Sequence, residues 1–442
     1  MHVTGNEEFM RRSLAAVWHP CTQMKLHESV PLVPIRRGEG IWLEDFDGAR
    51  YLDAISSWWV NLFGHCNPRI NAALHDQLGR IEHLMLAGFT HEPVVQLSER
   101  LSALTGNTLG RCFYASDGAS ATEIALKMSV HFWRNSGMAG KDRFLALKNG
   151  YHGETLGALS VTDVPLFRDA YAPLLRPAGI MPSPDWRGAE SGESAQAFAL
   201  RQAEALKRCL ERDHARIAAL IVEPLVQCAA GMAMHHPAYL RRVRELCDRY
   251  AVHLIADEIA VGCGRTGTFF AHEQAHIRPD FLCLSKGISG GYLPLSAVLT
   301  TDRVYAAFYS EDPARGFLHS HSYTGNALAC RAALATLDIF EQDDVLAANR
   351  GTAARLTQAC DALRGHPRVA HFRQCGMIWA FDVARAPRDF ARRFAQHAMT
   401  RGVLLRPIGS TVYFMPPYVI DDEAIALLAR AALLALDAAL ES

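Results

Sequence analysis

The sequence has no long hydrophobic run, almost no net charge and no repeated or low-complexity segment. Its 442 residues include 45 Lys and Arg against 46 Asp and Glu, a formal net charge of -1. This balance does not favour a nucleic acid or an anionic membrane surface as a partner. The longest apolar stretch, residues 424–440, is interrupted by Arg430 and Asp437 and is too short to span a membrane.

The cysteines form no recognisable framework. There are 11 of them, they occur singly, and no two stand in CxxC spacing. An odd number of scattered cysteines implies neither a set of disulfides nor a zinc ribbon. The apolar stretch near the start, residues 14–18, is too short for the core of a signal peptide. A reducing compartment fits this cysteine usage best, so we expect a cytoplasmic protein.

Strand and helix patterns alternate through the middle of the chain, which predicts an α/β fold with a large, mostly parallel sheet. Buried strands are expected over residues 111–115, 217–222, 253–257, 281–286 and 295–300. Helices are expected over residues 121–134, 237–250 and 326–340. Ser120 and Glu123 have the spacing of a capping box at the start of the first of these helices.

The pattern changes after about residue 330, where short strands and helices predict a smaller α+β domain. We expect an N-terminal segment over residues 1–60 that packs with the small domain, a large domain over 61–330, and the small domain over 331–442. A chain of this length is long enough for two or three domains with a large core.

Asp257 and Lys286 each stand at the end of a short apolar run. An acid and an amine at the ends of two buried strands suit pyridoxal phosphate, because the carboxylate keeps the pyridine nitrogen protonated and the lysine forms a Schiff base. An ordinary ion pair at strand ends explains these two residues equally well. The rest of the chain has to decide between the two interpretations.

Further segments carry groups that suit such a cofactor. Residues 116–120 lie between a strand and a helix, where small residues let backbone N–H groups approach a phosphate. Tyr151 lies in a loop rich in glycine, residues 149–155, and its ring can stack on a flat cofactor. Ser322 precedes a helix and is placed to donate its hydroxyl to a phosphate. A plain strand–helix turn and a structural tyrosine are the simpler interpretations of the first two.

Other motifs point to other functions. Residues 262–267 match the GxGxxG pattern of dinucleotide-binding dehydrogenases, but they do not follow the strand directly and no helix pattern follows them. His319 and His321 have HxH spacing, but no further ligands complete a zinc site, so we expect no metal. Trp58 and Trp59 suit the wall of a pocket for a long apolar substrate, although tryptophan more often packs in a core.

These features occur together in the order typical of one family. Residues 254–259, 264–267 and 285–290 form a highly specific block. With this block, the chain resembles the class III (ω-amino) aminotransferases of the aspartate aminotransferase superfamily over residues 18–420. The resemblance implies a pyridoxal phosphate-dependent transferase fold, with the cofactor in the domain over 61–330, and aminotransferase activity on small molecules. It also implies a homodimer with active sites at the subunit interface.

The resemblance implies a role for each matching residue. Lys286 would be the Schiff-base lysine, Asp257 the partner of the pyridine nitrogen, and Tyr151 a third catalytic residue beside cofactor and substrate. Backbone N–H groups of Gly118 and Ala119 would hold the phosphate, and His321 and Ser322 would complete that site from the other subunit. The remaining residues that the resemblance places in contact with substrate are Trp58, Trp59, Arg406 and Tyr413. Arg406 would bind the carboxylate of the keto acid, for which a bidentate guanidinium is suited.

Four positions depart from the family pattern. Cys21 stands where the family has a tyrosine that contacts substrate, and Ser320, also among the substrate-binding positions, where it has a glycine. Ala119 replaces a serine or threonine, which removes one hydroxyl from the phosphate site. Glu154 replaces an aspartate and is one methylene longer. Because Cys21 and Glu154 lie where substrate is discriminated, they bear on substrate choice more than on reaction type.

Within the family, several segments resemble the branch of biotin biosynthesis that transfers an amino group from S-adenosylmethionine to 8-amino-7-oxononanoate. These segments are residues 18–22, 56–59, 149–153, 406–409 and 413–418. Residues 21–25 and 321–326 partly resemble relatives that use lysine as amino donor. Two more hypotheses stay open: a transaminase of a different ω-amine, such as a diamine or β-amino acid, and a catalytically silent scaffold. The intact Asp257 and Lys286 argue against the silent scaffold.

Overall fold

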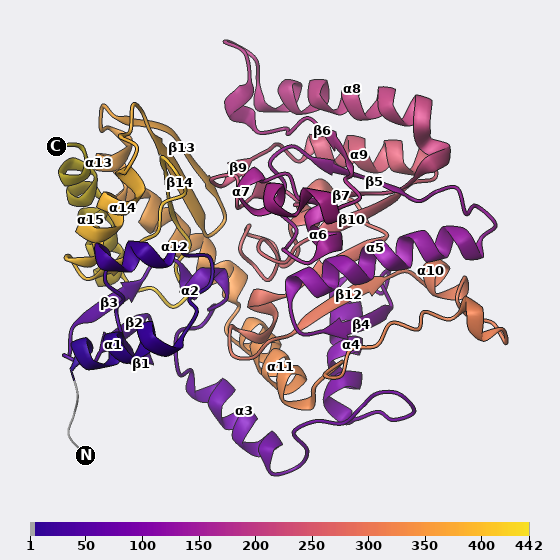
Figure 1. Cartoon of the computed structure of the whole chain (residues 1–442), viewed down its shortest axis with the longest axis horizontal. Helices are drawn as coiled ribbons and strands as arrows, with labels where there is room; N and C mark the ends of the chain where they lie inside the picture. Colours follow the sequence, from indigo (N-terminus) through magenta and orange to yellow (C-terminus); the bar gives the residue numbers. More distant parts are fainter. Residues whose placement is uncertain (1–4, 442) are drawn as a thin grey trace. The chain divides into compact units, whose positions relative to one another are not determined.

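The computed structural model of the chain describes residues 5–441 and divides into two compact units. Unit 1 combines Met1–Pro68 with Gly351–Phe372 and Ala380–Ser442, and unit 2 comprises Arg69–Arg350 with Arg373–Trp379. Unit 1 therefore contains segments from both ends of the chain, which Figure 1 draws in indigo and in yellow. No helix within residues 5–441 is long and apolar enough to cross a membrane.

Unit 2 is built on a mixed sheet with the strand order β4-β12-β11-β10-β7-β5-β6. Its strands are β4 (Arg111–Ala115), β5 (Arg143–Leu147), β6 (Gly179–Met181), β7 (Ile217–Val222), β10 (His253–Asp257), β11 (Phe281–Leu284) and β12 (Ser296–Thr300). Parallel pairs join β11, β10, β7, β5 and β6, whereas β12 runs antiparallel to both β11 and β4. The predicted α/β class with a mostly parallel sheet is confirmed.

Helices cover this sheet because its central strands have no exposed face. β7, β10, β11 and β12 are buried at every position, as expected for strands packed on both sides. α5 (Gly118–Asn135) packs against β11, β12 and β7 (Figure 1). α9 (Ala238–Arg249) packs against β10 and against α8 (Ala195–Asp213), and α11 (Ala327–Gln342) packs against α4 (Glu92–Leu104).

The start of α5 differs from the prediction. The helix begins at Gly118, and the Asp117 carboxylate is its N-cap, accepting hydrogen bonds from the Ser120 N–H at 2.9 Å and the Ser120 hydroxyl at 2.8 Å. Glu123 instead accepts a hydrogen bond from the Gly157 N–H at 2.7 Å. The predicted capping box of Ser120 and Glu123 is wrong because an aspartate three residues upstream already caps the helix.

The remaining elements of unit 2 are short. They are α3 (Pro68–Leu78), α6 (Leu156–Val161), α7 (Pro165–Arg168), α10 (Asp302–Ala306), β8 (Val226–Gln227), β9 (Ala233–Met234), and the 3-10 turns η2 (Asp169–Leu174), η3 (Trp186–Gly188), η4 (His214–Arg216), η5 (Ala271–Ala275), η6 (Lys286–Ser289) and η7 (Pro313–Arg315). β8 and β9 pair as an antiparallel ladder.

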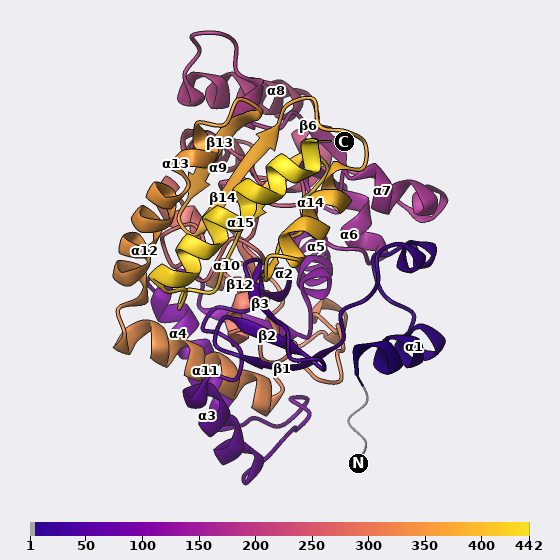
Figure 2. The ribbon, with the colours of Figure 1, turned by 90° about the vertical axis from the view of Figure 1, so that its left-hand side faces the viewer.

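Unit 1 contains a sheet in the order β1-β2-β3-β15, in which the C-terminal β15 pairs in parallel with β3. A second sheet has the order β13-β14-β16. The strands of both sheets are β1 (Ile35–Glu39), β2 (Trp42–Asp45), β3 (Arg50–Asp53), β13 (Val369–Cys375), β14 (Ile378–Val383), β15 (Val403–Leu404) and β16 (Thr411–Phe414). The helices with residues in unit 1 are α1 (Asn6–Ala16), η1 (Met24–Glu28), α2 (Ser56–Trp59), α12 (Val345–Ala359, of which the part from Gly351 on belongs to unit 1), α13 (Asp361–Arg364), α14 (Phe390–Met399) and α15 (Asp422–Leu440). Figure 2 shows α15 in yellow with α14 packed beside it.

Candidate functional site

Asp257 and Lys286 come from neighbouring parallel strands of unit 2. Asp257 is the last residue of β10 and pairs in register with Cys283 of β11. Lys286 opens the turn η6, two residues after β11 ends. The carboxyl ends of parallel strands are where open α/β sheets bind ligands. The structure therefore brings the predicted acid and amine to one such edge.

The Asp257 carboxylate is held from two sides. It is 4% exposed, its Oδ2 lies 2.6 Å from His152 Nδ1, and its Oδ1 accepts the Ile259 N–H at 3.1 Å. His152 is also buried, and its Nε2 has no hydrogen-bond partner among the described residues. Sequence reasoning did not assign His152 to the site. The signal that could have found it is its position next to Tyr151.

Glu223, directly after β7, adds a second buried carboxylate to this edge of the sheet. It accepts the N–H of Tyr151 at 3.0 Å and the N–H of Cys228 at 3.1 Å. Burial raises the pKa of Glu223 to about 7, a shift that His152 opposes and the charge of Asp257 reinforces. The sequence predicted the strand over residues 217–222 but assigned no role to Glu223, which directly follows that strand, so this residue was missed as well.

Lys286 has an uncommon backbone and an uncommon environment. Its φ is 47°, a left-handed value that costs of order 1 kcal/mol in a residue other than glycine and is found most often at functional sites. Although the residue as a whole is partly exposed, desolvation of its amine lowers the pKa of Lys286, while Asp257, Cys228 and Glu223 oppose that shift. The amine therefore loses its proton more readily than an exposed lysine.

The residues predicted to hold a phosphate surround the start of α5. Gly118 is packed so closely that an added Cβ would lie 2.8 Å from Ile259 Cγ2, so only glycine fits there. Ala119 faces Gly153, where an added Cβ would lie 2.5 Å from the Ala119 Cβ. Small residues thus keep the backbone accessible at the positive end of an 18-residue helix.

The histidine predicted for the phosphate site contacts the same strand–helix turn within one chain. His321 Nε2 lies 3.2 Å from Ser116 Oγ, while Nδ1 is buried without a hydrogen-bond partner among residues 5–441. The neighbours Ser320 and Ser322 are exposed. The structure therefore brings His321 to the Ser116–Ser120 turn and leaves both serines at the surface of the described chain.

Tyr151 and Glu154 contact each other. The Tyr151 hydroxyl donates a hydrogen bond to Glu154 Oε1 at 2.9 Å, and its ring packs edge-on against Phe167 with the centroids 5.5 Å apart. Glu154 is exposed and Tyr151 is half-buried. Glu154, which departs from the family pattern, is therefore hydrogen-bonded to the tyrosine that is predicted to contact cofactor and substrate.

In unit 1, the tryptophan pair lies on a left-handed turn. Four consecutive residues, Ser56, Ser57, Trp58 and Trp59, have φ values of 52°, 46°, 71° and 73° and form α2. Residues other than glycine normally visit this region singly, and each such residue costs roughly 1–2 kcal/mol. A run of four requires support from surrounding groups.

The two tryptophans have different surroundings. Trp59 is buried, and its Nε1 donates a hydrogen bond to the Tyr413 hydroxyl at 3.2 Å. Trp58 is 44% exposed, and the Arg406 guanidinium lies over its ring, 4.6 Å from the centroid. Unit 1 therefore groups Trp58 with Arg406 and Trp59 with Tyr413.

Cys21, also in unit 1, is exposed and has a left-handed φ of 51°.

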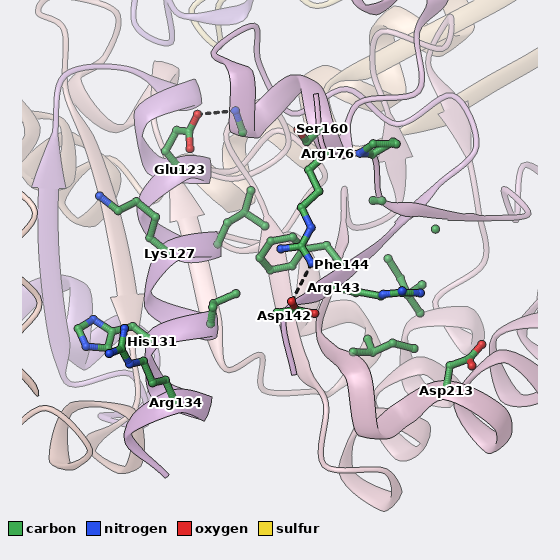
Figure 3. A pocket seen from close by; sticks show the side chains of 18 of the residues that line it. Glu123, Lys127, His131, Arg134, Asp142, Arg143, Phe144, Ser160, Arg176 and Asp213 are labelled. Atoms are coloured by element: carbon green, nitrogen blue, oxygen red, sulfur yellow. Dashed lines mark hydrogen bonds and ion pairs between the residues drawn. The ribbon is translucent and has the colours of Figure 1, made fainter. Parts of the chain in front are cut away.

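A cavity of about 1230 Å³ lies elsewhere on unit 2 (Figure 3). Charged side chains such as Lys127, Arg134 and Arg143 line it, and Arg176 pairs there with Asp142 at 2.7 Å. In the part of the chain that the structure describes, none of the predicted site residues lines this cavity. The cavity is therefore separate from the set of groups around Asp257.

The chain matches the family model of the class III aminotransferases over residues 24–435. It belongs to that family. The chain is therefore an aminotransferase, and the GxGxxG segment is not a dinucleotide fingerprint. In the structure, residues 262–267 form turns and open no helix. The predicted family and enzyme class are confirmed.

Full-length relatives support the same assignment. The chain is 46% identical over 427 residues to the adenosylmethionine-8-amino-7-oxononanoate aminotransferase of Helicobacter pylori, covering 95% of each protein. The crystal structure of the Methanocaldococcus jannaschii enzyme of that name superposes with a TM-score of 0.90 at 33% identity, covering 98% of this chain and 99% of that one. An amine transaminase from an uncultivated Pseudomonas species, solved in a PLP-bound form, superposes with a TM-score of 0.90 at 32% identity, covering 96% and 98%. The match of the whole chain to these solved transaminases confirms the predicted transferase fold.

Proposed function

We propose that this aminotransferase transfers an amino group from S-adenosylmethionine to the ketone of 8-amino-7-oxononanoate, giving 7,8-diaminononanoate for biotin biosynthesis in the cytoplasm. The observation that carries the proposal is the set of groups at one edge of the unit 2 sheet: a desolvated Lys286 amine beside the buried acids Asp257 and Glu223. The shared name of relatives that are 46% and 41% identical supports the choice of substrates.

The residues present fit pyridoxal phosphate as the cofactor. Asp257 offers a buried, oriented carboxylate for a protonated pyridine nitrogen, and Lys286 offers an amine that is easily deprotonated. The Gly118 site has no room for a Cβ and lies at a helix N-terminus, where a phosphate binds well. The buried Nε2 of His152, without a partner in the described chain, is a further polar atom that a ligand can satisfy.

When bound, pyridoxal phosphate supplies an electron sink for the negative charge that develops at the donor Cα. Lys286 Nζ, whose pKa burial lowers, would take the proton from that carbon and in the second half-reaction would return a proton to the acceptor carbon. Asp257 would hold the ring nitrogen of the cofactor in its protonated form, and the hydrogen bond from His152 orients the Asp257 carboxylate. Because donor and acceptor occupy the site in turn, we expect ping-pong kinetics.

We propose that Arg406 binds the carboxylate of the keto acid. A guanidinium stacked on an aromatic ring keeps its planar fork available for bidentate binding, and the Arg406–Trp58 contact has this form. Trp58 and Trp59 would contact the aliphatic chain of the substrate together with Tyr413, and Cys21, Ser320, Tyr151 and Glu154 complete the proposed substrate-binding set. The exposure of Trp58 supports a role in contact with a ligand.

We also propose a homodimer in which the exposed Ser322 reaches the phosphate site of the partner subunit, whereas His321 contacts the Ser116–Ser120 turn of its own chain. The segment around them carries large exposed apolar side chains: Leu318 is 82% exposed, and Tyr323 is 60% exposed. Apolar side chains gathered on a surface segment are typical of an interface. Sedimentation of the holoenzyme as a single species of twice the 48.7 kDa chain mass is the expected result.

A second candidate is transamination with another donor, favoured by Cys21 and by the Tyr151–Glu154 hydrogen bond at positions where the family discriminates substrates. The test is a set of donor half-reactions, followed by absorbance, with S-adenosylmethionine, lysine or a diamine as the only substrate. We expect S-adenosylmethionine to react fastest. Faster conversion by lysine or a diamine would replace the proposed donor.

The same assay tests the proposed base. Lys286→Ala should still bind the cofactor, but borohydride should no longer link the cofactor covalently to the protein, because the variant has no lysine to form the Schiff base. The rate of its donor half-reaction should fall by about 10²–10⁴-fold or more. Substantial steady-state transamination by Lys286→Ala would refute the assignment of Lys286.

A further inference from the structure

The left-handed turn that carries the tryptophans is tied to a buried carboxylate. Asp53 ends β3 and its side chain has no exposed surface. Its Oδ1 accepts the Ser57 N–H at 2.9 Å, and its Oδ2 accepts the Ser57 hydroxyl at 2.7 Å. One side chain thus holds the residue that directly precedes Trp58 at two points.

Asp53 is itself fixed by His65. His65 Nε2 lies 3.1 Å from Asp53 Oδ2, and the His65 backbone exchanges two hydrogen bonds with Gly40, at 3.0 Å and 2.6 Å. Gly38 packs against the same histidine, since an added Cβ there would lie 2.8 Å from the His65 Cβ. The carboxylate therefore sits between a histidine anchored on the β1–β2 turn and the turn α2.

The ends of α2 have other anchors. The Ser56 hydroxyl donates to the Met415 carbonyl at 2.7 Å, and Trp59 is held by its hydrogen bond to Tyr413. The middle of the turn, where Trp58 is exposed, is held through Ser57 by Asp53. Loss of the carboxylate would release this middle part while both ends stay attached.

We propose that Asp53, supported by His65, is a positioning residue for the substrate site. It fixes α2 in the left-handed conformation, keeps Trp58 under the Arg406 guanidinium, and so orients the group that receives the carboxylate of the keto acid. The inference rests on the proposed function, in which Trp58 and Arg406 contact that substrate. Asp53 acts through Ser57.

Only a carboxylate satisfies the three donors that converge on residue 53. Asparagine has one acceptor oxygen, and its NH₂ group would face a donor, so at least one of the Ser57 and His65 hydrogen bonds is lost. Glycine at position 57 would relieve the need for support, because glycine adopts positive φ without steric cost. These two substitutions have opposite effects on the turn and can be combined.

The test compares Asp53→Asn with Asp45→Asn in the full-length holoenzyme. Asp45 is a matched control: it is buried in the same sheet and accepts hydrogen bonds from Asn6, Tyr51 and two backbone N–H groups outside α2. The first readout, hydrogen–deuterium exchange over residues 54–62, needs no substrate. The second is the KM for the keto acid beside the rate of the donor half-reaction.

For Asp53→Asn we expect faster hydrogen–deuterium exchange over residues 54–62. We also expect the KM for the keto acid to rise about tenfold, the effect of losing roughly one hydrogen bond to a charged group. The donor half-reaction should change less than about twofold, and adding Ser57→Gly should restore part of the KM. Asp45→Asn should show neither effect. If Asp53→Asn does not fold, Ser57→Ala, which removes one of the two hydrogen bonds, takes its place.

Unchanged exchange and KM in Asp53→Asn, or equal changes in Asp45→Asn, would overturn the positioning role. If exchange rises but the wild type does not use 8-amino-7-oxononanoate, the proposed function fails. The KM is then measured with the acceptor that the wild type does use. An unchanged KM for that acceptor would overturn the positioning role on its own.

Discussion

His152 Nδ1 lies 2.6 Å from Asp257 Oδ2, and both side chains are buried. The Ile259 N–H holds the other oxygen of the carboxylate at 3.1 Å, so Asp257 cannot rotate without losing a hydrogen bond. Hydrogen bonds to charged groups contribute about 1.5–3 kcal/mol each. The orientation of the proposed acid at the cofactor ring therefore depends on a residue outside the predicted catalytic set.

Replacing His152 with alanine should slow the donor half-reaction about tenfold to a hundredfold, because Asp257 Oδ2 loses its donor in a buried site. The measurement is the single-turnover absorbance change with excess donor. His253→Ala is the matched control, because His253 is also buried and begins the strand that Asp257 ends, with Ser129 as its partner at 2.9 Å. Equal losses in both variants would mean that His152 supports the fold rather than Asp257.

Gly118→Ala should weaken cofactor binding by about 1–3 kcal/mol, the usual cost of overpacking. The new Cβ would lie 2.8 Å from Ile259 Cγ2, and the start of α5 has to move to relieve the contact. The measurement is titration of the apoenzyme with pyridoxal phosphate. Ile259→Ala in the same chain removes the clashing atoms and should restore most of the affinity. A double variant as weak as Gly118→Ala would show that the clash is not the cause.

The strands that carry the site were predictable because their sequence signals are local. The apolar runs that end near Asp257 and Lys286 correspond to β10 and β11, and both strands are confirmed within two residues. The partner of the acid was not predictable in this way. His152 is 105 residues from Asp257 and lies in a loop without a periodic pattern, so only the tertiary fold brings the two together.

The turn α2 was beyond sequence reasoning for a different reason. Nothing in the propensities of serine and tryptophan favours positive φ, and four such residues in a row contradict the usual limits of backbone conformation. The contacts that make this turn possible come from Asp53 and from Met415, which is 359 residues from Ser56. A local pattern cannot report support from so far away in the chain.

Arg406→Lys should raise the KM for the keto acid more than it changes the donor half-reaction. Lysine keeps the charge but loses the planar fork and the stacking on Trp58, so the expected loss is about tenfold, roughly one charged hydrogen bond. The two half-reactions are measured separately. Trp58→Phe, which retains an aromatic ring under the guanidinium, is the control and should lose less. Equal losses in both half-reactions would argue against Arg406 as the carboxylate-binding residue.

Glu223 should make the enzyme less stable as the pH rises. Burial raises the pKa of Glu223 from 4.5 to about 7, so the folded state retains a proton that the unfolded state has released between these values. The free energy of unfolding therefore falls as the pH rises through this window, and the contribution of this group is fully present below pH 4.5. The difference between the two pKa values corresponds to about 3 kcal/mol.

Urea unfolding of the wild type and Glu223→Gln at intervals between pH 4.5 and pH 8 isolates this contribution. Glutamine does not titrate, so the stability of the wild type relative to the variant should decrease by about 3 kcal/mol across the range, with most of the change below pH 7. The glutamine oxygen can accept only one of the Tyr151 and Cys228 N–H groups cleanly, which lowers the stability of the variant by a constant amount at every pH. The informative quantity is therefore how the difference in free energy of unfolding between the wild type and Glu223→Gln changes with pH. Parallel profiles would mean that Glu223 is ionised throughout this range and that the charges around it, with its two N–H donors, stabilise the carboxylate.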